Sequence, residues 1–417
     1  MNQPSGDRLA MLYRISQTFN STLNLGEVLD RVMDEVVTLT RAERGFLMLR
    51  ASDGSLVFRT ARGMEQRTIE APEFQISRGI VDRVALEGKP LLTSDAQLDP
   101  LLGERASVRL LGLRAILCVP LELRGKVQGV VYVDSRLQTG VFSPDDLDLL
   151  AGIASSAAIA IENARLYQVA VEKGRMEREL QVAREVQASL IPQAAPHLPG
   201  WEFAGWWQPA REVSGDFYDY VPFGDGHQGL LIGDVTDKGM PAALFMAHAR
   251  SIIRACAIAS SDAVTAIRNA NATLCAQTTN GMFVTLCLAH LEPSSGQLRY
   301  VNAGHNLPLH WDHKKKAWRP FGRPGLPLAI DPAAEYVEGT AEIRPGDLLV
   351  LYTDGLTDAT DARSELFGLE RVKNVLAAHA DASPEEVLDH IRRALAEFSG
   401  PTAPYDDVTL LIARRLA

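Results

Sequence analysis

The chain has 417 residues, of which 46% are hydrophobic and 23% are charged, and its formal net charge is −10. At roughly 100–200 residues per domain, this length predicts two or three domains, each able to bury its own core. The acidic balance argues against nucleic acid as the main partner, because affinity for that polyanion comes chiefly from Lys and Arg on phosphates.

The cysteines and the N-terminus indicate a soluble cytoplasmic protein. Four cysteines lie in apolar segments without CxxC spacing, which is typical of buried thiols in a reducing compartment: Cys118, Cys256, Cys275 and Cys287. The first seven residues are polar and contain no hydrophobic signal core. The longest run of small apolar residues, 151–161, is too short to span a bilayer, so we expect no membrane segment.

The N-terminal part alternates helical and strand patterns. Apolar residues recur at helical spacing from residue 9 to 39, with a break at Asn24 and Gly26. Two hairpins and a short helix are predicted farther along, at 44–50 with 56–61, at 115–123 with 127–134, and at 80–87. A long helix begins at Ser143, a capping residue followed by proline and two aspartates. This order is expected of a small α/β sensor domain.

Residues 9–167 resemble a GAF domain. The resemblance rests on three motifs: Ala42-Glu43-Arg44-Gly45-Phe46-Leu47-Met48-Leu49, Cys118-Val119-Pro120-Leu121 and Phe142-Ser143-Pro144. It implies a pocket between sheet and helices for a small-molecule or protein signal, whose identity the sequence leaves open. Many such domains serve only as dimerising modules. A cyclic-nucleotide receptor is a further alternative, for which no specific residues are present.

The helix that begins at Ser143 is predicted to continue to about Leu190. Its seam positions step in threes and fours, as in a coiled coil: Leu166, Val169, Lys173, Met176, Leu180, Ala183, Gln187 and Leu190. Gly174 weakens the middle of this stretch. One reading is a parallel coiled coil that couples two domains in a homodimer, and the other is an amphipathic helix lying on one domain.

Ile191-Pro192 ends this helix, and a proline-rich segment follows up to Gly200. We therefore predict a sensor domain at 1–165, a helical linker at 166–199 and a second domain at 200–417.

Strands and paired helices alternate in the second domain. Strands are expected at 201–207, 218–222, 230–235, 282–291, 298–302, 307–311, 347–352 and 408–413, and helices at 241–259, 262–276, 366–378 and 384–398. This order predicts two antiparallel sheets packed together with helices outside, an α/β sandwich, and makes the whole chain α+β. No GxxxxGK[ST] or GxGxxG element is present, which argues against a nucleotide-binding loop.

Four aspartates stand at strand ends in this domain, three of them beside glycines: Asp216, Asp234, Asp354 and Asp406. A carboxylate at the end of a buried strand projects from the rim of its sheet. Taken singly, each aspartate is more simply a turn residue, but the fourfold repeat favours a shared site. Converging carboxylates without cysteine pairs or spaced histidines favour a hard cation such as Mg²⁺ or Mn²⁺.

Two such cations can hold a shared water, lower its pKa and stabilise charge on a phosphoryl group. The sequence therefore predicts a two-metal phosphate hydrolase. The main-chain carbonyl of Val235 is a further possible ligand, because the neighbouring glycines allow close approach of the backbone.

Residues 200–417 resemble the SpoIIE-like branch of the metal-dependent PPM-type serine/threonine protein phosphatases. The motifs that carry the resemblance, in family order, are Ser214-Gly215-Asp216-Phe217-Tyr218-Asp219, Gly233-Asp234-Val235-Thr236-Asp237-Lys238-Gly239 with Ala242-Ala243, Asn302-Ala303-Gly304-His305-Asn306, Tyr352-Thr353-Asp354-Gly355-Leu356-Thr357-Asp358 and Asp406-Asp407-Val408-Thr409-Leu410. The preceding helical segment, 179–193, is similar to the one found in RsbU-like members.

The resemblance implies an αββα sandwich, two Mn²⁺ or Mg²⁺ ions, and phosphoserine or phosphothreonine on a protein as the substrate. By motif position, the metal ligands are Asp216, Asp234, Val235 through its carbonyl, Asp354 and Asp406. The partner that the resemblance implies is a phosphorylated STAS-domain anti-anti-sigma factor.

Some roles stay open at this point. Asp219 and Asp407 have no assigned role, and Asp237 stands where the family often has glycine. His305 could donate a proton to the leaving serine oxygen, although a structural role in its glycine turn is the simpler reading. Two other functions also remain: a non-catalytic scaffold that binds a phosphoprotein, and a hydrolase of small phosphoesters.

Overall fold

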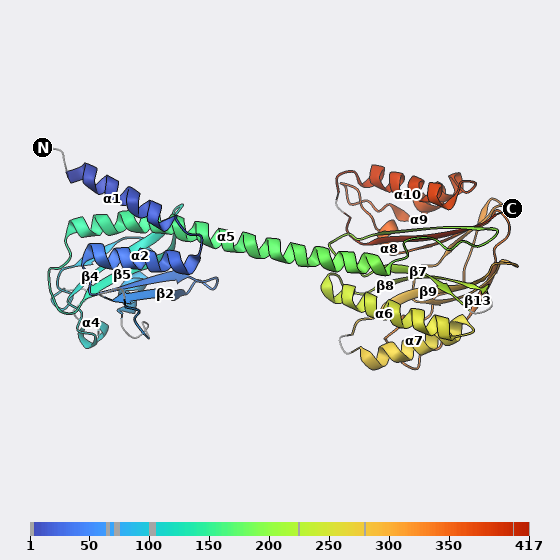
Figure 1. Ribbon diagram of the computed structural model, residues 1–417, viewed down its shortest axis with the longest axis horizontal. Helices are drawn as coiled ribbons and strands as arrows, with labels where there is room; N and C mark the ends of the chain where they lie inside the picture. Colours follow the sequence, from blue (N-terminus) through green and yellow to red (C-terminus); the bar gives the residue numbers. More distant parts are fainter. Residues whose placement is uncertain are drawn as a thin grey trace. The chain divides into compact units, whose positions relative to one another are not determined.

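The structure is a computed structural model. It describes residues 4–63, 67–70, 76–99, 106–223, 226–278, 281–402 and 404–416. The chain divides into two compact units, Met1–Met176 and Glu177–Ala417 (Figure 1). The predicted boundaries at 165 and 199 stay a prediction.

The N-terminal unit is built on one antiparallel sheet with the strand order β2-β1-β5-β4-β3. Its strands are β1 (Arg44–Arg50), β2 (Leu56–Gly63), β3 (Leu91–Thr93), β4 (Ala115–Leu123) and β5 (Lys126–Ser135). Its helices are α1 (Pro4–Phe19), α2 (Leu25–Thr40), α3 (Arg78–Glu87), α4 (Ala106–Leu110) and the first part of α5 (Pro144–Leu190). Both predicted hairpins are confirmed, whereas β3 and α4 were not predicted.

Side chains alternate between two buried faces of this sheet. On β4, Leu117 and Val119 pack in the cluster that contains α2 and α5, and Ile116 and Cys118 pack in the cluster that contains α3. A period of two is the geometry of a strand that is buried on both sides. The break predicted at Asn24 is the N-cap of α2, where its side chain accepts hydrogen bonds from the backbone of Gly26 and Glu27.

Helix α5 begins and ends where the sequence predicts. Its first half is buried in the N-terminal core through residues such as Leu150, Ile153 and Ala157. The part of the predicted seam that follows is exposed, with Leu166 at 54% and Met176 at 57%, and the seam becomes buried again at Gln187. An exposed seam is compatible with pairing to a second helix but does not test it, so the homodimeric coiled coil stays a prediction.

The C-terminal unit consists of two antiparallel sheets with helices on the outside, as predicted (Figure 1). One sheet has the order β13-β10-β9-β8-β7 and the other β12-β11-β14-β15-β6. The strands are β6 (Trp201–Gln208), β7 (Phe217–Pro222), β8 (Gln228–Val235), β9 (Val284–Glu292), β10 (Gln297–Ala303), β11 (Leu309–Asp312), β12 (Ala317–Arg319), β13 (Gly339–Glu342), β14 (Leu348–Tyr352) and β15 (Val408–Arg415). The helices are α6 (Met240–Ala259), α7 (Ala263–Gln277), α8 (Asp354–Thr357), α9 (Gly368–Ala378) and α10 (Pro384–Ser399).

The interior strand β15 contributes side chains to two cores. Leu411 and Ala413 lie in the cluster between the sheets, which also contains buried residues of α6 and α7. Leu410 and Ile412 lie in the cluster under α9 and α10. Because alternate residues of one strand serve both cores, a one-residue slip of β15 would disrupt both of them.

Two helices of the described chain, α5 and α6, are long and apolar enough to cross a membrane by length and composition alone. Each buries one face in a core described above. Core helices of soluble proteins share this pattern. Of the predicted buried thiols, Cys118 and Cys287 are buried, whereas Cys256 and Cys275 are only half-buried on the helices that cover the sandwich.

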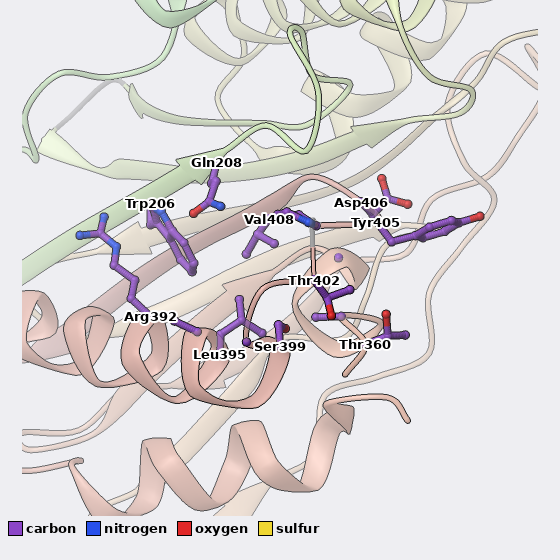
Figure 2. A pocket seen from close by; sticks show the side chains of 15 residues that line it. Trp206, Gln208, Thr360, Arg392, Leu395, Ser399, Thr402, Tyr405, Asp406 and Val408 are labelled. Atoms are coloured by element: carbon purple, nitrogen blue, oxygen red, sulfur yellow. The ribbon is translucent and has the colours of Figure 1, made fainter. Parts of the chain in front are cut away.

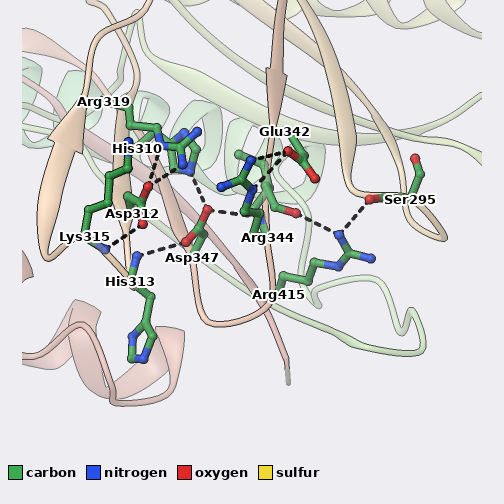
Figure 3. A network of polar contacts seen from close by, with 11 residues as sticks. Ser295, His310, Asp312, His313, Lys315, Arg319, Glu342, Arg344, Asp347 and Arg415 are labelled. Atoms are coloured by element: carbon green, nitrogen blue, oxygen red, sulfur yellow. Dashed lines mark hydrogen bonds and ion pairs between the residues drawn. The ribbon is translucent and has the colours of Figure 1, made fainter.

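A polar network ties the hairpin of β11 and β12 to the start of β14 (Figure 3). Asp347, just before β14, accepts a hydrogen bond from the backbone N–H of His313 at 2.9 Å. Its carboxylate is also hydrogen-bonded to Nε2 of His310, on β11, at 2.9 Å. Asp312 accepts from the backbone N–H of Lys315 at 2.9 Å and from Arg319 Nε at 2.8 Å. The hydrogen bond from the backbone of Lys315 and the positive charge of Arg319 lower the pKa of Asp312 to about 2.

Replacing Asp312 by Asn should destabilise the protein by about 1 kcal/mol at pH 7, after allowing for solvent screening. An aspartate with a depressed pKa stabilises the fold above its unfolded pKa, and this stabilisation is lost as the pH falls towards 2. Urea unfolding of both proteins between pH 7 and pH 3 measures this. The difference should shrink with falling pH, and a constant difference would contradict it.

Candidate metal centre

Strand pairing brings the predicted aspartates together at one edge of the sandwich. Phe217 of β7 pairs with Gly233 of β8, so Asp216 and Asp234 flank this pair at adjacent strand ends. In the other sheet, the N–H of Thr353 donates to the carbonyl of Thr409 at 3.0 Å, which aligns the end of β14 with the start of β15.

Side-chain hydrogen bonds connect the two sheets at this edge. Thr353 Oγ1 donates to Asp216 Oδ2 at 2.7 Å and also accepts from the N–H of Thr409 at 2.9 Å. Asp407, beside Asp406, accepts from Ser214 Oγ at 2.8 Å and from the N–H of Gly215 at 2.9 Å. The aspartates of the two sheets therefore share one neighbourhood.

The carboxylates in this neighbourhood repel one another. Asp216 is 2% exposed, and burial together with repulsion from Asp234 raises its pKa well above the usual value. Burial and the charge of Asp354 raise the pKa of Asp234 to about 7, although a hydrogen bond from Asp216 acts in the opposite direction and lowers it. Burial and the charge of Asp406 likewise raise the pKa of Asp354. Each of the four predicted aspartates thus acts electrostatically on at least one other.

Lys238 brings a positive charge to the cluster. Lys238 Nζ donates to Asp406 Oδ2 at 2.8 Å and to the carbonyl of Tyr405 at 3.0 Å, and it lies 4.2 Å from the centre of the Tyr405 ring. The one positive charge of Lys238 does not balance several ionised carboxylates, and a divalent cation would compensate the remainder and favour ionisation of all four.

The donor set suits a hard cation that keeps part of its water shell. Among the described residues, no group of three or more His, Cys, Asp or Glu side chains is placed so that it could hold one metal ion by itself. Mg²⁺ commonly binds through one or two carboxylates and retains several waters, so neighbouring carboxylates are sufficient. A Cβ on Gly215 would lie 3.0 Å from the carbonyl oxygen of Val235, so the absence of a side chain leaves this oxygen accessible.

Comparisons with known proteins identify both units. Residues 24–161 match the GAF domain model, and residues 224–416 match the model of stage II sporulation protein E (SpoIIE). The chain contains a GAF domain and a SpoIIE-like domain of the PPM phosphatase family.

Two curated relatives and one solved structure are consistent with this assignment. Protein IcfG of Synechocystis is 31% identical over 293 residues, covering 63% of this chain and 46% of IcfG. Phosphoserine phosphatase RsbU of Bacillus subtilis is 26% identical over 242 residues, covering 58% of this chain and 71% of RsbU. The SiaA-PP2C domain of Pseudomonas aeruginosa superposes with a TM-score of 0.54 at 22% identity, covering 60% of this chain and all of that domain, which shows the shared fold. The chain thus spans less than half of IcfG.

The two unassigned aspartates of the SpoIIE-like domain have structural partners. Asp407 holds the loop that precedes Asp216, since it also accepts from the N–H of Ala210 at 2.7 Å. Asp219 is 1% exposed and forms ion pairs with Arg250 at 2.7 Å and Arg254 at 2.8 Å. Asp219 is therefore neutralised by arginines of α6, unlike the carboxylates of the cluster.

His305 has the environment of a structural residue. It is 3% exposed, its Nδ1 lies 2.9 Å from Thr285 Oγ1, and its backbone is held by the side chain of Asn302. Burial lowers its pKa to about 4, so the imidazole is neutral at pH 7. A neutral, enclosed imidazole is a poor proton donor to a leaving serine oxygen, which supports the structural reading.

Asp237 of the SpoIIE-like domain adopts a backbone φ of 72°. This left-handed region disfavours most residues and suits glycine. Asp237→Val should therefore destabilise the protein by about 1–2 kcal/mol, because β-branched residues tolerate this region worst. Asp237→Gly should change stability by less than about 0.5 kcal/mol, since relief of strain offsets the added flexibility of the unfolded chain. Thermal unfolding of the two variants checks this, and equal losses would refute the backbone argument.

Sequence reasoning did not assign Gln187, Thr353 or Lys238 to the site. Gln187 was predicted as a coiled-coil seam residue, but its side chain is buried in the SpoIIE-like unit. Its Nε2 donates to the carbonyls of Ser214 at 2.9 Å and Ala243 at 3.2 Å, and its Oε1 accepts from the N–H of Ser214 at 3.0 Å. The sequence signal that could have identified Gln187 as a site residue was its polar side chain at a seam position that is usually apolar.

Proposed function

We propose that this protein is a cytoplasmic serine/threonine phosphatase that uses two Mn²⁺ or Mg²⁺ ions to hydrolyse phosphoserine or phosphothreonine on a signalling protein. The observation that carries the proposal is the cluster of mutually repelling carboxylates at the edge of a PPM-type fold. Burial of unpaired negative charge is costly, and a function that binds cations explains why it is retained.

The ions would be held by Asp216, Asp234, Asp354 and Asp406 with the carbonyl of Val235. When bound, such ions activate a water molecule and stabilise charge on the phosphoryl group. Thr353 fixes the carboxylate of Asp216 through its hydroxyl hydrogen bond.

Asp407 fixes the loop that carries Asp216, so both the ligand and its backbone are positioned before substrate arrives. Lys238 places a positive charge at the rim of the cluster, where it can attract a phosphate dianion.

The name of one relative supports the proposed substrate class. RsbU is named a phosphoserine phosphatase, and a phosphorylated STAS-domain anti-anti-sigma factor is the partner that the family resemblance implies. The test is hydrolysis of a phosphoserine protein by the full chain with Mn²⁺, compared with the same reaction in EDTA and with a panel of small phosphoesters. Activity on the small esters alone would favour the small-phosphoester alternative. Phosphoprotein binding without any hydrolysis would favour the scaffold.

We also propose that the GAF domain controls the phosphatase through α5, acting in a homodimer. The support is the contact of Gln187, near the end of α5, with the loop of Asp216 and the start of α6. A rotation of the helix would move this contact directly.

Insertions into α5 test this control without knowledge of the signal. Two added residues after Lys173 rotate the following helix by about 200°, whereas seven added residues nearly restore its face. We expect the two-residue insertion to change phosphatase activity at least fivefold and the seven-residue insertion to leave it near wild type. Equal activity of all three proteins under Mn²⁺ saturation would rule out control through the phase of the helix.

A further inference from the structure

A groove of about 400 Å³ opens beside the carboxylate cluster, between α10, the start of β15 and the loop after α8 (Figure 2). Its lining includes Asp406 of the cluster and Gly355, the residue after Asp354, so it is continuous with the proposed catalytic centre. Besides Asp406, the lining residue that takes part in the contacts of the metal centre is Tyr405, whose carbonyl accepts from Lys238.

The groove has an apolar base and a cation at one end. Trp206, Leu395 and Val408 contribute apolar surface to its lining. Arg392 lies with its guanidinium 5.1 Å from the centre of the Trp206 ring, and its side chain is 43% exposed. Its contact with Asp389, on the same helix, is long at 3.5 Å. Most of its five donors thus remain available to a ligand.

The groove runs from Arg392 towards Asp406. Figure 2 shows Arg392 and Trp206 on one side, Asp406 and Tyr405 on the other, and Leu395 and Ser399 between them. Along α10, Arg392 and Ser399 are seven residues apart, which corresponds to about 10 Å of helix rise. An extended peptide covers that distance in about three residues.

We propose that this groove binds the polypeptide that flanks the phosphorylated serine of the substrate. An apolar side chain of the substrate packs on Leu395 and Trp206, and a carboxylate three to five residues from the phosphoserine pairs with Arg392. The proposal rests on the proposed phosphatase function and specifies its substrate. Continuity with the carboxylate cluster and the exposed guanidinium argue for an acidic, extended protein segment as the occupant.

Synthetic phosphoserine peptides on an alanine background test this with the full-length protein and Mn²⁺. Some peptides carry Leu two residues and Glu four residues from the phosphoserine, on either side, and others carry Lys in place of Glu. Hydrolysis gives kcat/KM, fluorescence anisotropy gives binding, and p-nitrophenyl phosphate reports activity that does not use the groove. We expect at least a tenfold higher kcat/KM for one Leu/Glu peptide than for the all-alanine peptide.

Arg392→Glu should reverse the preference from Glu to Lys peptides and leave p-nitrophenyl phosphate hydrolysis unchanged. Arg393→Glu is the matched control, because it makes the same charge change on the same helix outside the groove lining. Leu395→Glu should remove the benefit of the substrate leucine.

The outcomes separate the two proposals. Hydrolysis of every peptide at one rate, unaltered by Arg392→Glu, would overturn the groove proposal and leave the phosphatase function intact. Selective binding without hydrolysis of any probe would reject the phosphatase function and retain the groove. A change of oligomeric state in Arg392→Glu, with peptide selectivity unchanged, would assign the groove to a second copy of the chain and overturn the proposal.

Discussion

Asp234→Asn is expected to lower Mn²⁺-dependent hydrolysis by about 10³-fold or more and to make the metal-free protein more stable. The activity falls because an amide is a much weaker ligand for a hard cation than a carboxylate. The stability rises because the substitution removes a buried charge that Asp354 and Asp406 repel. A stabilisation of about 2 kcal/mol is expected at pH 7, where part of the population carries that charge.

Asp219→Asn is the matched control for this change. Asp219 lies on the neighbouring strand β7 and is also buried, but Arg250 and Arg254 neutralise it. Its replacement should destabilise the protein, because two arginines lose their partner. Urea unfolding in EDTA and in Mn²⁺ measures both variants, and only wild type and Asp219→Asn should gain stability from Mn²⁺. A less stable metal-free Asp234→Asn protein would refute the repulsion argument.

Gln187→Leu is expected to raise the Mn²⁺ concentration for half-maximal activity by about tenfold or more. The side chain of Gln187 makes three hydrogen bonds to the backbone of Ser214 and Ala243. Leucine would leave these buried groups without partners, at a cost of about 2–4 kcal/mol in stability. The loop that positions Asp216 would then be less restrained, and outer-shell changes of this kind typically cost 10–100-fold in metal affinity.

Gln181→Leu provides the control on the same helix. Gln181 is exposed, and within the described part of the chain its side chain hydrogen-bonds Glu185. Its replacement should therefore alter neither stability nor metal dependence. Metal titrations of activity, together with thermal unfolding, separate the two effects. An unchanged Mn²⁺ requirement in a destabilised Gln187→Leu protein would show that the contact is structural only.

The fold was predictable because its elements carry strong local signals. The helix that begins at Ser143 has a cap, a proline and two aspartates, and its structural bounds agree with the prediction. Short edge strands such as β3 and β13 were missed, since three or four residues cannot establish a periodicity. Their place in the sheet comes from pairing with β4 and β10.

The site was predictable only in part, for a physical reason. Aspartates at strand ends are visible in the sequence, and the structure brings the four predicted ones into electrostatic contact. The groups that hold them are not visible in this way. Thr353 reaches Asp216 across 137 residues of sequence, and Gln187 reaches Ser214 from a helix whose pattern resembles a coiled coil. Contacts between distant segments depend on packing, which local patterns do not encode.

The hydrogen bonds that Asp407 accepts from Ala210, Ser214 and Gly215 also have a consequence for the order in which the protein folds. Asp407 immediately precedes β15, the last of the described strands in chain order. This strand pairs with β6, which lies some 200 residues earlier. Until the ribosome has released this segment, the loop of Asp216 lacks its anchor. A chain cut by a protease before β15 would lose this anchor, so the loop of Asp216 would no longer be held beside the other aspartates of the cluster.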